Sequence, residues 1–418
     1  MSFHVEIDIA NASVLILGGG NVALRKTKQC LEEGANVFIL SKEIKDEFRE
    51  LSITIVHEPY HKAMLSQYLF CIACTSDKAF NEQVFADAKK MHCLCMGVHQ
   101  EDASNMRPMV SKDFDDFQIA VSTKGKYPAM TSNLVDEAGA FLQETQGERL
   151  RLLSSIRKAL PNTLDACTRQ KFCRLLLTVS YDILLQIKEI LNHDCIRILC
   201  YHGVKDEHVL ETIKTFETLV QQKHSKELIC SAYISQAVCK TINASNYKVF
   251  ELGVFLPYFH QFHKTIILQP MLFQKGVYFD LIQKWETYSN VFIEEPMFAS
   301  DEAIEELCEC ISSTYATYDQ ILVCYHSSKD GDFCNKLKRL APQFPNLYFS
   351  REVKVPFEVK LKGHRIFVLS LYMLTGKHSK DTVERVDELR RQGNEVTYLQ
   401  QSMIELECMR DLLIQKIL

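Results

Sequence analysis

An apolar strand that runs directly into consecutive glycines is the feature that most constrains the fold of this chain. The strand covers Ser13–Leu17 and the glycines are Gly18–Gly20. A helix is predicted over residues 21–33 and a second apolar strand over residues 36–40. A strand, a glycine turn, a helix and a parallel strand form the βαβ unit that binds a pyrophosphate at a helix N-terminus. Glycine is needed there because a Cβ would keep the phosphate from the backbone amides.

The residues around this turn and at the ends of the neighbouring strands are the candidate cofactor site. They are Gly18, Gly19, Gly20, Asn21, Val22, Lys42, Glu43, Thr75 and Ser76. Gly18 and Gly20 fit the first two positions of the G-x-G-x-x-G pattern, and Ala23 takes the third. No acid stands directly at the end of the second strand, and Lys42 could face a 2′-phosphate. The sequence therefore predicts NAD as cofactor and leaves NADP open.

Length and composition limit the remaining possibilities. A chain of 418 residues is expected to form two or three domains. Hydrophobic residues make up 47% and charged residues 24%, which is typical of globular proteins and excludes disordered and fibrous classes. The formal net charge of −5 gives no basic surface for nucleic acid or anionic lipid. No apolar run approaches the roughly 20 residues of a membrane helix, so we expect neither a nucleic-acid nor a membrane partner.

The cysteine content is high, at 16 residues, but far below that of a disulfide scaffold. Residues 1–13 carry no signal-peptide pattern, so we expect a cytoplasmic protein with reduced thiols. Three pairs of cysteines are closely spaced: Cys71 and Cys74, Cys93 and Cys95, and Cys308 and Cys310. None is followed by a second pair at the spacing of a zinc ribbon. We expect these thiols to be buried core residues.

The first half continues with strands over residues 69–75, 93–98 and 117–123. Three of its segments resemble the dehydrogenase module of siroheme synthases: Leu15–Ala23 with Arg25 and Lys26, Ala73–Asp77 with Asn81, and Ile119–Ala129. The resemblance covers about residues 1–190. It implies an NAD-dependent precorrin-2 dehydrogenase with a Rossmann domain over residues 1–112. It also implies a helical dimerisation segment over residues 113–192, and hence a homodimer.

One position departs from that family. The family carries its proposed catalytic aspartate just after the strand that matches residues 93–98, where this chain has His99. Three alternatives stay open. Asp102 takes the place of the missing carboxylate, His99 accepts the proton near neutral pH, or dehydrogenation is impaired.

The second half contains an internal duplication. The frame Cys-Tyr-His-x-x-Lys-Asp occurs at residues 200–206 and again at 324–330, each time at the end of an apolar strand that precedes a helix. We therefore expect residues 193–418 to form two similar α/β lobes, with the loops at the C-terminal strand ends facing a cleft.

Polar residues at strand ends of the second lobe form a candidate catalytic or metal site. His326 and His378 each follow an apolar strand, and Glu352 ends the strand between them. Neutral imidazoles at one sheet edge can bind a divalent metal or accept protons. The residues therefore indicate a metal or acid–base site.

The same region resembles the anaerobic cobaltochelatases, above all in Met373–His378 with Asp381. That resemblance covers about residues 195–418. It implies insertion of Co²⁺ or Fe²⁺ into sirohydrochlorin by two histidines and a glutamate, which correspond to His326, His378 and Glu352. His202 stands where that family normally has no histidine, and it is a candidate third imidazole or a relic of the duplication.

Together the two resemblances predict a bifunctional, siroheme synthase-like α/β enzyme with a tetrapyrrole substrate. The first module would oxidise precorrin-2 to sirohydrochlorin with NAD, and the second would insert Fe²⁺. The alternatives are a cobaltochelatase for cobalamin synthesis, or a chelatase whose dehydrogenase half only binds dinucleotide.

Overall fold

The computed structural model divides the chain into two compact units, Met1–Gly147 and Glu148–Leu418. The structure describes the whole chain except residues 1–3, 98–103, 125, 207, 225, 245–247, 264, 274, 326–331, 352–361, 375–378 and 418. Within the described part, no helix is both long and apolar enough to cross a membrane.

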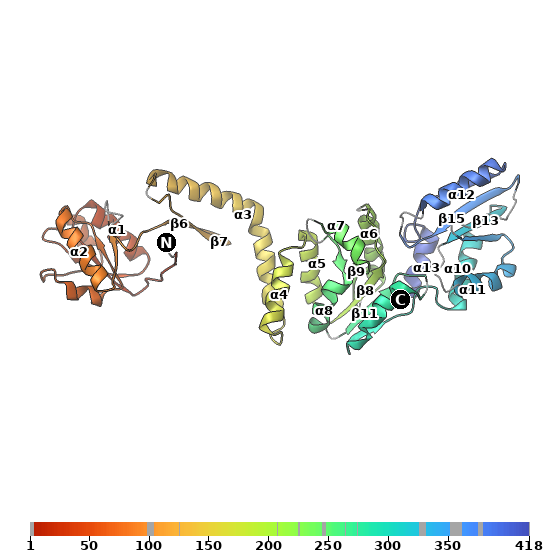
Figure 1. Ribbon diagram of the computed structural model, residues 1–418, viewed down its shortest axis with the longest axis horizontal. Helices are drawn as coiled ribbons and strands as arrows, with labels where there is room; N and C mark the ends of the chain where they lie inside the picture. The colour runs from red at the N-terminus through yellow and green to blue at the C-terminus, as the bar shows by residue number, and fades with distance from the viewer. Residues whose placement is uncertain are drawn as a thin grey trace. The chain divides into compact units, whose positions relative to one another are not determined.

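The first unit is built on a five-stranded parallel sheet with the order β3-β2-β1-β4-β5, the order of the dinucleotide-binding fold. Figure 1 draws this part of the chain, with α1 and α2, in red to orange. Its strands are β1 Ser13–Leu17, β2 Asn36–Leu40, β3 Ile53–Ile55, β4 Phe70–Ala73 and β5 Leu94–Gly97. The helices of this region are α1 Asn21–Glu32, η1 Asp46–Glu50, η2 Lys62–Gln67 and α2 Lys78–Lys90. Apolar side chains cover both sheet faces, so the strands are continuous hydrophobic runs, as expected for a parallel sheet. The predicted Rossmann-type fold is confirmed.

A hairpin and a long helix follow this sheet. β6 (Val110–Phe114) and β7 (Phe117–Val121) pair only with each other, and α3 spans Pro128–Ala159. A Cβ on Gly139 of α3 would lie 1.7 Å from the Phe114 ring, so this glycine lets the hairpin pack against the helix. The strand predicted over residues 117–123 thus exists, but it lies outside the main sheet.

The second unit begins with the end of α3, α4 (Ala166–Leu176) and α5 (Tyr181–Leu191), which pack on a second parallel sheet. That sheet has the order β10-β9-β8-β11-β12. Its strands are β8 Cys195–Tyr201, β9 Leu228–Tyr233, β10 Phe250–Glu251, β11 Thr265–Pro270 and β12 Val291–Ile293. Its helices are α6 His208–Lys223, α7 Gln236–Ile242, α8 Leu252–Phe262, α9 Val277–Gln283 and η3 Lys284–Thr287.

A third parallel sheet has the order β14-β13-β15-β16. Its strands are β13 Gln320–Tyr325, β14 Leu347–Arg351, β15 Arg365–Leu371 and β16 Glu395–Tyr398. The helices around it are α10 Asp301–Thr314, α11 Asp332–Leu340, η4 Ala341–Gln343, α12 Ser379–Arg391 and α13 Glu407–Ile417. In chain order, this sheet repeats the arrangement β9-β8-β11-β12 of the preceding one. The two-lobed architecture is therefore confirmed, with β8 and β13 as equivalent central strands.

One hydrophobic core joins these two lobes. It contains side chains of β8 and β9 together with side chains of β13, β15, α10 and α13. The boundary between the two units lies at residues 147–148, inside α3 and inside the predicted dimerisation segment. The domain limits at residues 112 and 192 stay predictions.

Candidate functional site

The glycine turn lies where the strand order of the first sheet reverses, between β1 and β4. Gly18 has φ +133°, and a Cβ on it would lie 2.9 Å from the carbonyl oxygen of Cys74. The Cys74 amide donates to the Leu17 carbonyl at 3.0 Å, so the ends of the two strands meet here. Open α/β sheets bind ligands at such a reversal, outside the C-terminal strand ends.

The next two glycines differ from each other. A Cβ on Gly19 would lie 2.1 Å from the carbonyl oxygen of Glu43, whereas a Cβ on Gly20 would have nothing within 4 Å. Gly19 therefore lets the loop after β2 pack close to the turn, and Gly20 leaves open space in front of α1. The Lys45 amide donates to the Gly19 carbonyl at 3.2 Å and holds the two loops together.

Within the described residues, no side chain caps the N-terminus of α1. Gly20 is the N-cap residue and supplies no capping side chain, and the first turn holds no acid. Asn21 is exposed and Val22 is half-buried. Amides at a helix N-terminus that no side chain satisfies attract an anion such as a pyrophosphate. The predicted glycine residues therefore fit the phosphates of a dinucleotide.

Lys26 adds a positive charge behind the turn. Burial, followed by the charge of Arg25, lowers the pKa of Lys26, while the nearby Cys30 and Cys74 thiols act in the opposite direction. Its Nζ donates to Oε1 of Gln29 at 3.0 Å.

The loop after β4 is held by a buried asparagine. Asn81 is 4% exposed, and its Nδ2 donates to the carbonyl oxygen of Thr75 at 2.9 Å. Oδ1 of Asn81 accepts from the Thr75 hydroxyl at 2.8 Å. Asp77 caps α2 by accepting from the amide of Phe80 at 3.1 Å, so α2 begins at Lys78 and Asn81 lies on its first turn. These bonds position Thr75, while Ser76 stays exposed beside it.

The loop after β2 presents two exposed charges of opposite sign, those of Lys42 and Glu43. The Ser41 hydroxyl donates to the Glu43 carbonyl at 2.6 Å and fixes the backbone of this loop. Either side chain suits a dinucleotide ribose. The Glu43 carboxylate can accept from the ribose hydroxyls of NAD, and the Lys42 ammonium can pair with the 2′-phosphate of NADP. The choice between NAD and NADP stays a prediction.

Five of the predicted catalytic and metal residues lie outside the described residues. They are His99, Asp102, His326, Glu352 and His378. The strands that precede them are described: β5, β13, β14 and β15 end at Gly97, Tyr325, Arg351 and Leu371.

His202 is described and directly follows β8. Its ring contacts the Tyr278 ring edge-on, with centroids 4.1 Å apart. The next residue, Gly203, has φ +105°, and a Cβ on it would lie 2.8 Å from the Tyr233 ring. Among the described residues, no three His, Cys, Asp or Glu side chains are grouped so as to hold a metal ion. A metal role for His202 stays a prediction.

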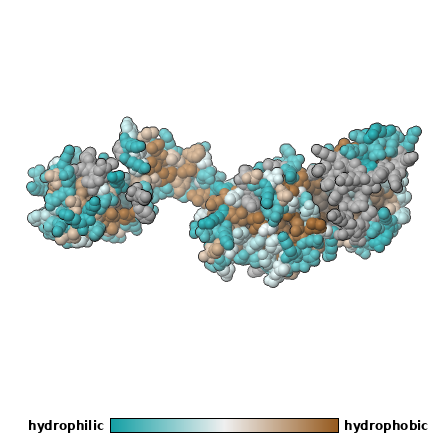
Figure 2. Space-filling model, viewed as in Figure 1, coloured by the Kyte–Doolittle hydropathy of each residue, from teal (hydrophilic) through white to brown (hydrophobic). Residues whose placement is uncertain are grey.

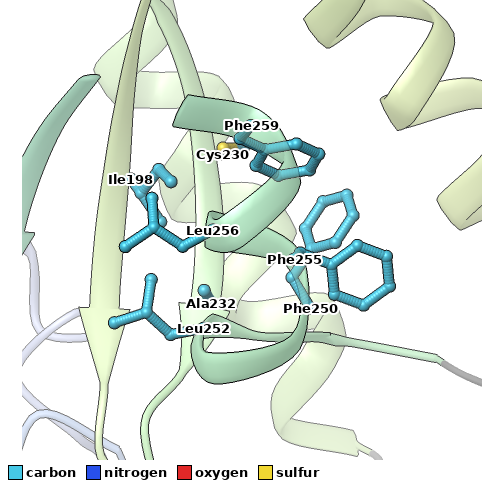
Figure 3. Close-up of a pocket in the computed structure, with 8 residues that line it drawn as sticks. All are labelled: Ile198, Cys230, Ala232, Phe250, Leu252, Phe255, Leu256 and Phe259. Atoms are coloured by element: carbon cyan, nitrogen blue, oxygen red, sulfur yellow. The ribbon is translucent and has the colours of Figure 1, made fainter. Parts of the chain in front are cut away.

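A hollow under α8 carries no polar chemistry. Figure 3 shows its lining: Ile198, Cys230, Ala232, Phe250, Leu252, Phe255, Leu256 and Phe259. Burial raises the pKa of Cys230 well above its usual value. These side chains belong to the core between α8 and the sheet, so the hollow is packing rather than an active site.

Comparison with known proteins agrees with the first site. Residues 5–107 match a family model described as putative NAD(P)-binding. The siroheme synthase of Tolumonas auensis is 29% identical over 165 residues, which are 39% of this chain and 35% of that protein. Part of this chain is related to siroheme synthases. Siroheme synthase 2 of Yersinia enterocolitica is 26% identical over 201 residues, 47% of this chain and 42% of that protein. The chain thus spans about two-fifths or less of the curated relatives that it matches.

Among solved structures, one match is to "SirC, precorrin-2 dehydrogenase", with a TM-score of 0.33 and 19% identity. It covers 46% of this chain and 98% of that chain.

Sequence reasoning missed two positioning residues. Ser41 and Asn81 hold the loops that carry Glu43 and Thr75. Asn81 belongs to one of the segments that resemble siroheme synthases, but the sequence did not indicate what its side chain binds. Its signal was a capping aspartate four residues earlier, which places an asparagine on the first turn of the following helix.

Proposed function

We propose that this chain acts in siroheme biosynthesis and that its first unit is an NAD-dependent precorrin-2 dehydrogenase. The main support for this proposal is the open, glycine-lined N-terminus of α1, which lies where the strand order of the sheet reverses. The similarity to siroheme synthases supports the choice of substrate. When bound, NAD⁺ supplies the hydride acceptor. The amides at Gly20 and Asn21 hold its pyrophosphate, and the loops at Glu43 and Thr75 border its nucleoside.

The proton released in this oxidation needs an acceptor. His99 or Asp102 follows the C-terminal end of β5, the strand next to β4 in the sheet. An imidazole or a carboxylate near this edge can take a proton near neutral pH. Incubation of the full chain with precorrin-2 and NAD⁺ tests the proposal through NADH formation. We expect turnover in the wild type and its loss in His99→Ala or Asp102→Ala.

One result would favour the alternative that the first unit only binds dinucleotide. It is NAD⁺ binding by the wild type, measured by calorimetry, without NADH formation. No NAD⁺ binding at all would overturn the cofactor site itself.

We propose that the second unit inserts Fe²⁺ into sirohydrochlorin. Insertion requires two pyrrole protons to leave as the metal enters, and histidines can hold a divalent metal and accept protons. His326 and His378 would do this, with Glu352 balancing charge and His202 as an additional ligand. The repeated strand order supports two equivalent strand-end loops, those after β8 and β13.

The absorption spectrum of sirohydrochlorin with Fe²⁺ and the purified chain tests this step. His326→Ala or His378→Ala should abolish insertion, and Glu352→Gln should slow it. Normal rates in all three variants would refute the assignment. Parallel assays with Co²⁺ decide whether the chain is instead a cobaltochelatase for cobalamin synthesis.

We also propose that the chain forms a homodimer through α3 and the β6–β7 hairpin. Figure 2 shows hydrophobic surface over this segment. Exposed apolar side chains in α3 and just before it include Tyr127 at 65%, Met130 at 49% and Phe141 at 63%. An apolar surface of this kind marks an interaction site. Phe141→Glu should convert a dimer into monomers in analytical ultracentrifugation, and a monomeric wild type would refute the proposal.

A further inference from the structure

Two cysteines that are distant in the sequence meet where α10 and α13 pack together. Cys310 lies in the last turns of α10 and Cys408 in the first turn of α13, 98 residues later. At the opposite end of this antiparallel pair, Lys416 Nζ lies 2.5 Å from Oε2 of Glu306. The two cysteines are therefore held together by a packed helix pair rather than by a loop.

The contacts around Cys408 favour its thiolate. The Cys310 Sγ lies 3.6 Å from the carbonyl oxygen of Cys408, and the Tyr315 hydroxyl lies 3.9 Å from the Cys408 Sγ. Hydrogen bonding from Cys310 is the largest cause that lowers the pKa of Cys408, to about 6. Thr314, Tyr315 and the amide of Met409 act in the same direction, and burial opposes them. The same bond, with burial, raises the pKa of Cys310.

Partial exposure sets this pair apart from the other described cysteines of the second lobe. Cys310 and Cys408 are both partly exposed, whereas Cys308 and Cys324 are buried. Burial raises the pKa of Cys308 to about 12 and that of Cys324 to about 12. A reactive thiol needs both thiolate character and access, and Cys408 combines them.

A second cysteine cluster, in the first unit, lacks that access. Cys71 and Cys95 are register partners on β4 and β5, and the Cys93 Sγ lies 3.5 Å from the carbonyl oxygen of Leu65. Cys71 is 0% exposed and Cys95 is 1% exposed. Oxidants in solution do not reach these sulfurs in the folded protein.

We propose that Cys310 and Cys408 form a peroxide-oxidisable dithiol site. The Cys408 thiolate attacks one oxygen of the peroxide, the O–O bond breaks and hydroxide leaves, which a proton converts to water. The Cys310 thiol then attacks the resulting sulfenic sulfur, and its proton leaves with the sulfenic hydroxyl as a second water. Two thiols and one hydrogen peroxide thus give one disulfide and two waters. A dithiol reductant restores both thiols.

The bond would close a covalent loop around the whole second lobe. Strands β13–β16 all lie between the two cysteines, and so do His326, Glu352 and His378. A disulfide that closes a long loop restricts the unfolded chain more than it alters the folded one. Oxidation should therefore stabilise the second lobe and leave its fold unchanged.

Peptide mass spectrometry of the full chain after treatment with hydrogen peroxide tests the proposal. We expect a Cys310–Cys408 crosslinked peptide, which disappears with dithiothreitol, and a higher thermal midpoint for the oxidised protein. Cys408→Ser should abolish both effects, and Cys310→Ser should leave a sulfenic acid that a dimedone probe traps at Cys408. The control Cys167→Ser removes an exposed thiol and should change neither result.

Tyr315→Phe separates thiolate activation from simple proximity. It removes the hydroxyl near Cys408 but keeps an aromatic ring that stacks on Phe367. The centroids of the Tyr315 and Phe367 rings are 3.8 Å apart. We expect its oxidation to slow several-fold below about pH 7 and to approach the wild-type rate at higher pH. The proposal is overturned if peroxide oxidises Cys167 while Cys310 and Cys408 remain unlinked in the wild type.

Discussion

The carbonyl oxygen of Cys74 lies 2.9 Å from the point that a Cβ on Gly18 would occupy. The ends of β1 and β4 therefore approach so closely that glycine alone fits between them. This close approach fixes where the glycine turn leaves β1 and leads into α1.

Replacing Gly18 should destabilise the first unit. Gly18→Ala combines a clash with an unfavourable φ of +133°, and we expect the free energy of unfolding to fall by about 1–3 kcal/mol. Urea unfolding followed by circular dichroism measures the change. Gly20→Ala is the matched control because Gly20 has φ −91° and open space around its Cα. Gly20→Ala should leave stability unchanged but weaken NAD⁺ binding at least tenfold. Unchanged NAD⁺ affinity would place the pyrophosphate elsewhere.

Removing the Asn81 side chain should loosen the loop after β4. Asn81→Ala leaves the backbone carbonyl and the hydroxyl of Thr75 without these partners, which costs about 1–3 kcal/mol of stability. Chemical unfolding of the variant measures the loss. Ser76→Ala, at an exposed neighbour, should change stability by no more than about 0.5 kcal/mol. Equal effects of both changes would contradict a specific role for Asn81.

A buried ion pair should matter far more than an exposed one in the second unit. Arg197 is 7% exposed and contacts Glu227 at 2.7 Å and Gln269 at 3.1 Å. Arg197→Ala leaves the mostly buried Glu227 carboxylate without its arginine partner and should cost about 3–5 kcal/mol. The exposed pair Lys214–Asp182 offers the comparison, and Lys214→Ala should cost at most about 1 kcal/mol. Calorimetric unfolding of both variants ranks the two pairs, and a similar cost for both would contradict the prediction.

Glu217 should make the stability of the second unit depend on pH. Burial raises the pKa of its carboxyl to about 7, and the nearby Ser231 and Lys214 offset only part of this. The unfolded chain therefore releases the proton at lower pH than the folded chain does. Stability should be highest below about pH 4.5 for this group and fall by about 2–3 kcal/mol as pH rises to about 7.

The control for this prediction is Glu217→Gln, which keeps the shape and removes the titration. The stability difference between the variant and the wild type should grow in favour of the variant from about pH 5 to about pH 8. Urea unfolding at both pH values measures it. A constant difference would show that Glu217 does not titrate between these limits.

Local patterns were sufficient to predict much of the fold. Ser13–Leu17 and Asn36–Leu40 are continuous apolar runs beside glycine or polar residues, and both strands have the predicted bounds. The duplication was visible because identical residues, such as Tyr201 and Tyr325, end equivalent buried strands. β6 was missed because Val110–Phe114 has exposed polar residues and no apolar alternation.

The sites were less predictable than the strands. The glycines of the turn carry a sequence signature, but the hydrogen bonds from Asn81 to Thr75 depend on how α2 docks against β4. The meeting of Cys310 and Cys408 leaves no local signal, since the two residues come together only when α13 packs against α10. Contacts of this kind follow from tertiary packing, which periodicity and spacing do not encode.

The C-terminal helix has a consequence for synthesis of the chain. Leu413, Ile414 and Ile417 of α13 are buried in the core that both lobes share, and the Ile417 carbonyl lies 3.2 Å from Nε2 of His224, just after α6. These residues are synthesised after every strand of both sheets. Part of the apolar surface of the first lobe therefore stays exposed to solvent until α13 has left the ribosome and packed against it. During that interval, chaperones and aggregation compete for the nascent chain.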